Sequence, residues 1–434
     1  MHFPGSYTRI PAQGARQEHL SSEHGGESFG QKCQDDSIFM SDSVSPFTPR
    51  RTALFTFAAC GLFVVLGIVT TLLGPILPLL SVHWSISIAQ AGILFSWQFI
   101  SSVVGALLSG ALVAKRSFKT AIVLGIALCL AGVASLVTAD WTVGRYAVGC
   151  YGFGLGLALP AINLAVAEAN KTRQAASVSL LNFAWGIGAV AGPKLLRLAH
   201  DLTSYLILVV AALLVGLLAA YLQPTPARNR DEQRSEGAQS SPVWNVVPLL
   251  AISMFLYCGV ESAISGWIAT LALPNFANAY IATNANVAFW IFFLAGRAFA
   301  PAVLRRMREE KFLLLSIFIS ATGVFAFYFA RNQASILGAC ALAGAGVGPG
   351  FPLLIARVSE LIGTQHPAAT FCFAFAGIGG GLLSTFVGLL GARLGQPRAG
   401  LLLPLLALAI LVPLARRLAG LGAPETVPST KLFT

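Results

Sequence analysis

The feature that most constrains this chain is a succession of long apolar runs. Each run is about 20 residues or longer, the length of helix that crosses the hydrocarbon core of a bilayer. None of them shows the polar–apolar alternation of a membrane barrel strand, so helices are the only spanning structure that fits. The sequence therefore predicts about twelve transmembrane helices, at residues 53–80, 87–113, 119–138, 143–168, 174–196, 203–222, 244–272, 283–304, 312–330, 334–358, 367–392 and 398–418.

Composition points to lipid as the solvent of this chain. Of its 434 residues, 56% are hydrophobic and 10% are charged, whereas a soluble domain carries about 25% charged residues. The predicted fold class is an all-α membrane protein. The net charge of +11 comes from residues scattered over short loops, where membrane orientation and anionic lipids explain it better than nucleic acid binding does.

Polar segments divide the chain into five parts. Residues 1–50 contain no apolar run and are predicted to form a disordered tail. Six spans follow within 51–222, a solvated linker rich in Pro, Arg, Glu and Ser covers 223–243, six more spans lie within 244–418, and 419–434 form a second tail. If the N-terminus is cytoplasmic, 21 of the 28 Lys and Arg residues lie on the cytoplasmic side. This bias predicts a cell-membrane protein with both termini in the cytoplasm.

An internal repeat relates the two sets of six spans. The fourth and tenth runs match at an offset of 192 residues, through the pairs Gly152/Gly344, Gly154/Gly346, Gly156/Gly348, Pro160/Pro352, Val166/Val358 and Glu168/Glu360. The first and seventh runs share two glycines at the same offset, and the fifth and eleventh share Gly-Ile-Gly at an offset one shorter. Repeats with an even number of spans keep the same orientation, which predicts a solute site between the two halves near the midplane.

Five segments resemble the major facilitator superfamily, and within it the sugar branch of fucose permease, bacterial glucose/galactose transporters and sodium-dependent glucose transporter-like proteins. They are 67–78 (GIVTTLLGPILP), 181–193 (LNFAWGIGAVAGP), 257–267 (YCGVESAISGW), 346–352 (GVGPGFP) and 376–382 (AGIGGGL). The resemblance extends over 51–420. It implies two six-helix halves and secondary transport of a small solute.

The chain departs from the family pattern at two places. The loop after the second run keeps the basic residues Lys115 and Arg116, which we assign to a cytoplasmic gate, but Ala114 replaces the usual Asp. Fucose permeases carry acids in the first and fourth spans, whereas this first run has none and Leu159 stands at the fourth-span position. A fucose-type proton relay is therefore not carried over.

Glu261 is the one acid placed near the middle of a predicted span. Burying a carboxylate there costs roughly 2.5–3.5 kcal/mol on insertion scales, so function is the first hypothesis. Tyr257 lies one turn earlier on the same helical face and is predicted to orient the carboxylate. Three roles stay open for Glu261: an acceptor for sugar hydroxyls, a group that takes up H⁺ or Na⁺, or a structural carboxyl paired with an arginine.

The eighth run carries a second candidate stripe. Asn286, Trp290, Phe293 and Arg297 recur at spacings of 4, 3 and 4 residues, so they share one helical face. An amide beside an aromatic face suits a pyranose, which has polar edges and apolar C–H faces. Arg297 is equally compatible with a gate salt bridge or a head group that reaches the interface.

Further polar and aromatic residues lie in other spans. Each can be a substrate contact or an interhelical hydrogen bond, and Trp267 can line the cavity or sit in the interfacial belt. Glu168 and Glu360 are predicted gate residues that pair with the nearby Lys171, Arg173 or Arg357. The remaining candidate substrate contacts are Gln98 in the second span, Asn163 in the fourth, and Asn182 and Trp185 in the fifth.

The sequence lacks the motifs of several other functions. The seven cysteines form no CxxC pair, so neither a metal site nor a disulfide framework is predicted. The glycine runs lack the GxxxxGK[ST] pattern of a phosphate loop, and no motif supports catalysis or a cofactor. We expect a monomeric transporter in contact with lipid, moving a small molecule, with a monosaccharide preferred. The alternatives are an exporter of drugs or metabolites and a non-transporting sensor or scaffold.

Overall fold

The computed structural model describes residues 48–226, 245–362 and 367–421. Most of the predicted tails and of the predicted linker lies outside these ranges, and the tail residues 49–50 and 419–420 belong to helices. Within them, twelve helices are long and apolar enough to cross a membrane. The chain is thus a multi-pass membrane protein, and the all-α prediction is confirmed.

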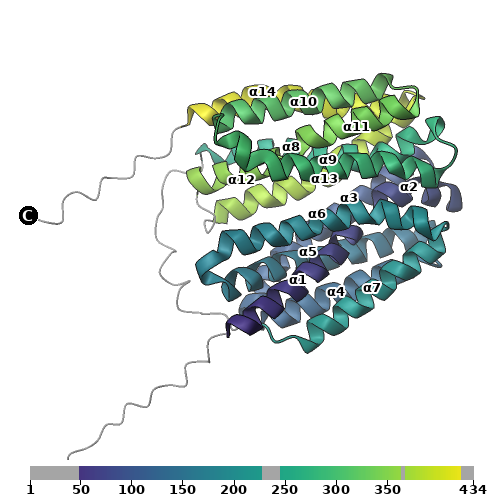
Figure 1. Ribbon diagram of the computed structural model, residues 1–434. Helices are drawn as coiled ribbons and strands as arrows, with labels where there is room; N and C mark the ends of the chain where they lie inside the picture. Colours follow the sequence, from purple (N-terminus) through teal and green to yellow (C-terminus); the bar gives the residue numbers. More distant parts are fainter. Residues whose placement is uncertain (1–47, 227–244, 363–366, 422–434) are drawn as a thin grey trace, which may run out of the picture. The chain divides into compact units, whose positions relative to one another are not determined.

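The helices fall into two sets that we call the N-half and the C-half (Figure 1). The N-half consists of α1 (Pro49–Thr70), α2 (Leu73–His83), α3 (Ile88–Lys115), α4 (Phe118–Leu136), α5 (Trp141–Ala169), α6 (Gln174–Ala199) and α7 (Leu202–Leu222). The C-half consists of α8 (Val247–Ala272), α9 (Ala279–Leu304), α10 (Glu309–Phe329), α11 (Gln333–Val347), α12 (Gly350–Leu361), α13 (Pro367–Arg393) and α14 (Leu402–Gly420).

Short polar residues set the helix starts. The side chain of the N-cap residue accepts a hydrogen bond from a backbone N–H of the first turn, which would otherwise lack a partner. Ser87 adds a capping box, because Gln90 bonds back to the Ser87 amide at 2.9 Å. N-caps with such a bond are Thr48, Ser87, Ser117, Asp140, Asp201, Asn278 and Asn332.

Two predicted spans are broken rather than continuous. The 53–80 run forms α1 and α2, and the 334–358 run forms α11 and α12. Proline explains both breaks, because it lacks an N–H and its ring clashes with the carbonyl four residues earlier. Because Pro75 has no N–H, the Thr71 carbonyl lacks its helical donor. Pro349 and Pro352 likewise leave the carbonyls of Ala345 and Gly348 without helical donors.

The repeat is visible in the packing of equivalent helices. Gly188 of α6 lies against α1, where an added Cβ would stand 2.0 Å from the Val64 carbonyl oxygen. Gly379 of α13 lies against α8, where an added Cβ would stand 2.0 Å from the Phe255 carbonyl oxygen. Both glycines and both carbonyls are 191 residues apart. Such close approach of two backbones is what small residues allow in membrane helices.

The helix ends define two ends of the bundle. We call the end where α1 begins, α7 ends, α8 begins and α14 ends the linker end, and the other the opposite end. The principal contacts between the halves pair α3 with α13, α6 with α9, and α2 with α8 and α9. These contacts place a cavity between the halves.

Candidate functional site

A cavity of about 90 Å³ lies between the halves, large enough for several water molecules or a small polar solute. Its polar lining consists of hydroxyl, amide and carboxylate side chains, and its apolar lining is mainly aromatic. The polar residues are Thr70, Thr71, Gln98, Glu261, Ser262 and Ser265, and the aromatic ones are Phe95, Phe99, Trp185 and Trp290. Of the predicted substrate contacts, Gln98, Trp185, Glu261 and Trp290 meet here.

Gln98 is held firmly at the wall of this cavity. Its Nε2 donates to the Thr70 carbonyl at 2.7 Å, and its Oε1 accepts from the Tyr151 hydroxyl at 3.1 Å. The Thr70 carbonyl lies at the end of α1, where the break before α2 leaves it without a helical partner. Gln98 therefore stabilises the broken span and forms part of the cavity lining.

Two tryptophans from opposite halves meet at the cavity. The rings of Trp185 on α6 and Trp290 on α9 lie edge to face, with centroids 5.6 Å apart and an angle of 84°. Trp290 is 3% exposed, and its indole Nε1 has no hydrogen-bond partner among the described residues. A buried indole N–H usually finds a partner, so Trp290 retains a donor for a bound molecule.

Asn286 lies next to this wall. It is fully buried, and its Nδ2 donates to the Ser265 carbonyl at 2.6 Å. Its Oδ1 has no partner among the described residues, although Asn286 is not one of the cavity-lining residues. An amide with one bonded and one free end fixes the α8–α9 contact and keeps an acceptor close to the cavity.

Glu261 and Arg297 come together at the cavity edge. Arg297 Nη2 lies 3.9 Å from Glu261 Oε2, while Arg297 Nε donates to the Gly348 carbonyl at 3.0 Å. The guanidinium also lies 4.3 Å from the centre of the Phe293 ring. The carboxylate makes this one long ion pair and no hydrogen bond within the described part of the chain. Its oxygens are therefore open to a solute.

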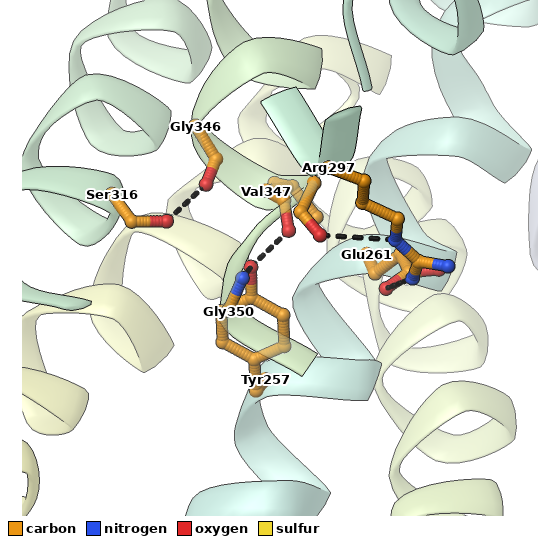
Figure 2. A network of polar contacts seen from close by, with 8 residues as sticks. Tyr257, Glu261, Arg297, Ser316, Gly346, Val347 and Gly350 are labelled. Carbon is orange, nitrogen blue, oxygen red and sulfur yellow. Dashed lines mark hydrogen bonds and ion pairs between the residues drawn. The ribbon is translucent and has the colours of Figure 1, made fainter. Parts of the chain in front are cut away.

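The predicted contact between Tyr257 and Glu261 is wrong. The Tyr257 hydroxyl donates to the Val347 carbonyl and accepts from the Gly350 amide at 3.0 Å (Figure 2). Tyr257 is also absent from the cavity lining. The physical reason is the break between α11 and α12, which leaves backbone groups that a phenol can satisfy as both donor and acceptor.

Trp267 lies in neither of its two predicted positions, the cavity lining and the interfacial belt. It is fully buried, its Nε1 donates to the Ser384 carbonyl at 2.8 Å, and its ring lies 5.9 Å from that of Phe95. It supports a cavity wall from behind, because Phe95 lies between it and the cavity. A tryptophan buried on all sides cannot act as an interfacial anchor.

Asn163 and Asn182 also lie outside the cavity lining. Each donates to the carbonyl four residues earlier in its own helix: Asn163 to Leu159 at 3.0 Å and Asn182 to Val178 at 2.9 Å. Such local bonds are a common way for a polar side chain to satisfy its donor in a helix. The structure therefore does not bring either residue to the solute cavity.

The predicted gate residues cluster at the linker end, with one exception. Glu168 pairs with Lys171 at 3.0 Å, and Glu360 pairs with Arg357 at 2.6 Å. Arg297 lies instead beside Glu261, deeper in the C-half. Lys115 ends α3 and Arg116 is its C-cap, and both are exposed.

Sequence reasoning missed several cavity residues. Ser262 and Ser265 follow Glu261 on α8, Thr70 ends α1, and Thr71 is the C-cap of α1. The signal for the threonines was Pro75, which removes the backbone donor of the Thr71 carbonyl and so marks a place where the first span can kink or break. Within the described residues, no group of three or more His, Cys, Asp or Glu is arranged to hold a metal.

Comparison with known families identifies the fold. A sequence profile of the Major Facilitator Superfamily matches residues 59–376. The chain belongs to the Major Facilitator Superfamily. No curated protein sequence matches this superfamily member.

Solved structures of other transporters share this superfamily fold. A variant of the E. coli fucose:proton symporter FucP is 20% identical, with a TM-score of 0.59 over 85% of this chain and 99% of that chain. A D-xylose-proton symporter is 13% identical, with a TM-score of 0.68 over 82% of this chain and 96% of the other. A mutant of the nucleoside transporter NupG is 15% identical, with a TM-score of 0.67 over 85% and 99%.

In this superfamily member, the halves meet at the opposite end. Ser96 Oγ of α3 lies 2.6 Å from Thr385 Oγ1 of α13, and Thr385 also donates to the Gly92 carbonyl at 2.8 Å. Arg197 of α6 bonds Asn284 of α9 at 3.1 Å near the same end.

Proposed function

We propose that this protein is a secondary transporter that moves a small, uncharged, polyhydroxylated solute, of which a monosaccharide is the simplest case. The observation that carries this proposal is the cavity between the halves. It combines hydroxyls, an amide and a carboxylate with two tryptophan rings. A pyranose presents hydroxyls at its edges and C–H groups on its faces, so it needs both kinds of contact.

The free hydrogen-bonding atoms support a hydroxylated solute over a purely apolar one. Trp290 offers a donor and Glu261 offers acceptors at the same cavity. A hydroxyl group can use both, because it donates and accepts. An apolar compound would leave these buried groups unpaired, which costs roughly 1–3 kcal/mol for each group. Two of the solved structures that share the fold are named as sugar–proton symporters, which is in keeping with this choice.

The contacts between the halves support alternating access as the mechanism. The halves touch from Ile88 and Gly388 at the opposite end to Val103 and Gly377 near the middle of α3 and α13. This arrangement corresponds to a state that admits solute from the linker end. Rocking the halves about the cavity would close the linker end and open the other.

The orientation of the bundle is part of this proposal. Because 21 of the 28 Lys and Arg residues lie at the linker end or on the segments attached to it, we place that end in the cytoplasm. Single cysteines introduced into 1–50, 223–243 and 419–434 should resist a membrane-impermeant reagent applied to whole cells. Labelling of 223–243 from outside would reverse the orientation.

Counterflow in proteoliposomes tests the transport function. Vesicles loaded with one unlabelled compound are diluted into the same compound in radiolabelled form, with aldohexoses, deoxyhexoses, pentoses, nucleosides and a lipophilic cation as the panel. We expect a transient accumulation of label for at least one monosaccharide and none for the cation. Counterflow of the cation alone would favour the exporter alternative, and binding without flux would favour the sensor.

A further inference from the structure

The tenth span of the C-half is interrupted in its middle. α11 ends at Val347 and α12 begins at Gly350. Pro349 and Pro352 cannot donate to the carbonyls of Ala345 and Gly348, which would be their partners in a continuous helix. In lipid, backbone groups freed in this way must find other partners or cost several kcal/mol each.

Side chains from three neighbouring helices bond backbone groups at this break, including one of the two carbonyls freed by the prolines, that of Gly348 (Figure 2). Ser316 of α10 donates to the Gly346 carbonyl, and Tyr257 of α8 bridges the Val347 carbonyl and the Gly350 amide. Arg297 of α9 donates to the Gly348 carbonyl at 3.0 Å. Backbone groups at the break are thus bonded by side chains of α8, α9 and α10, so tertiary contacts hold the interruption in place.

The repeat offers an internal comparison. The equivalent span of the N-half, α5, runs unbroken from Trp141 to Ala169 although Pro160 matches Pro352. The difference is Pro349, because its N-half equivalent is Leu157. The supporting side chains are missing as well, since the positions 192 residues before Tyr257, Arg297 and Ser316 are Val65, Gly105 and Leu124. The proline and its three supports therefore occur together, in one half only.

Arg297 differs from the other two supports because it also contacts a residue that lines the cavity. It is the one support that pairs with a charged cavity residue, Glu261, and Glu261 has no counterpart in the N-half, where Val69 stands at the equivalent position. We propose that Arg297 is a positioning residue that couples the charge of Glu261 in the solute cavity to the angle between α11 and α12. This inference builds on the proposed transport function.

The physical basis is the cost of an unpaired buried charge. While Glu261 is ionised, the guanidinium is attracted to it and stays where Nε reaches the Gly348 carbonyl. When the carboxylate takes up a proton, Arg297 loses its counter-charge. A solute hydroxyl that donates to the carboxylate leaves its charge in place but competes with the guanidinium for the same oxygens. The long stem of Arg297 then carries the head group toward linker-end water, the Gly348 carbonyl loses its donor, and α12 changes its angle to α11.

A distance measurement within the C-half tests this coupling. Nitroxide labels go on Lys311→Cys at the start of α10 and Ala356→Cys on α12, two exposed positions, in a background without the seven native cysteines. Pulsed dipolar spectroscopy at about pH 8 then compares the parent protein with Glu261→Gln, Arg297→Met and the double variant. We expect both single variants to replace the parent distance population with the same second population, and the double variant to add no further shift.

Two outcomes would overturn the coupling. One is a Glu261→Gln distribution identical to the parent, and the other is a double variant that shifts by the sum of the singles. Glu261→Gln is close to isosteric, so it keeps the test valid even if Arg297→Met does not fold. The matched control is Glu168→Gln, which removes a carboxylate paired with Lys171 at 3.0 Å in the other half and should leave the distribution unchanged. An equal shift in this control would show a nonspecific response.

The measurement needs no transported solute and reports on one half only. Its failure would leave the transport proposal standing. Absence of counterflow, in turn, would leave a positive distance result intact, since the coupling between Glu261 and α12 does not depend on which compound is carried.

Discussion

The side chain of Glu261 lines the cavity. The Arg297 guanidinium lies 3.9 Å from its carboxylate, which makes no hydrogen bond among the described residues. We predict that Glu261→Gln weakens solute binding about ten- to a hundredfold, because a charge-assisted hydrogen bond is worth roughly 1.5–3 kcal/mol. Binding of the sugar identified by counterflow would be measured by calorimetry or by the concentration dependence of counterflow.

The same variant separates solute binding from ion coupling. If Glu261 is the coupling group, counterflow persists while uphill accumulation driven by an H⁺ or Na⁺ gradient is lost, because counterflow needs no net ion movement. A variant that matches the parent protein in both assays would assign the carboxylate a structural role.

At the residue scale, helical periodicity predicted which residues share a face, but not what that face meets. Glu261 and Trp290, predicted as substrate contacts, both line the cavity, as their places near the middle of apolar spans suggested. Tyr257 lies on the face of Glu261, yet its longer side chain reaches the broken span. That contact depends on how α8 packs against α11 and α12, which spacing within α8 does not encode.

At the element scale, Gly188 tests the close approach of α6 to α1. Gly188→Ala would bring a Cβ to 2.0 Å from the Val64 carbonyl oxygen, and overpacking of this kind costs about 1–3 kcal/mol. We expect a clear drop in the thermal unfolding temperature of the detergent-solubilised protein. The control is Gly192→Ala one turn later, where the added Cβ meets nothing closer than 3.5 Å. An equal loss in both variants would contradict the close-approach explanation.

The start of α7 gives a prediction with pH dependence. The Asp201 carboxylate accepts from the Ser204 amide at 2.7 Å, and its bonds to Ser204 hold the pKa of Asp201 below the usual value of 3.8. A lowered native pKa means that the cap stabilises the fold above the unfolded-state pKa and is lost as the pH falls through the native pKa. Between about pH 5 and about pH 3, the unfolding temperature should fall more steeply for the parent protein than for Asp201→Asn. Parallel curves would show that the cap does not titrate.

The positions of the spans could be predicted because length and apolarity alone define them. The breaks at Thr71 and at Gly348–Pro349 could not be placed with the same rules. Pro160 leaves α5 intact, whereas Pro349 and Pro352 interrupt the equivalent span. Whether a proline kinks or breaks a helix depends on which side chains can satisfy the freed groups, and those come from helices distant in sequence.

At the scale of the whole molecule, the contact between Ser96 and Thr385 joins the two halves. Because their oxygens lie 2.6 Å apart, cysteines at both positions should form a disulfide under mild oxidation. We predict that Ser96→Cys combined with Thr385→Cys loses counterflow on oxidation and recovers it with a reductant. The single variants control for the native cysteines. Undiminished counterflow in the cross-linked protein would show that these helices need not separate during transport.

The short helix α2 has a consequence for the speed of the cycle. Its 11 residues extend from the N-half onto α8 and α9, and an added Cβ on Gly74 would stand 2.8 Å from the Ser265 carbonyl oxygen. In the proposed cycle, the opposite end opens only when α2 has left α8 and α9 and when α3 has separated from α13. Part of the activation barrier of that half-cycle therefore lies in this small element. A substitution that loosens α2 away from the cavity-lining Leu73 and Gly74 would accelerate one direction of the conformational exchange and leave solute affinity in the present state unchanged.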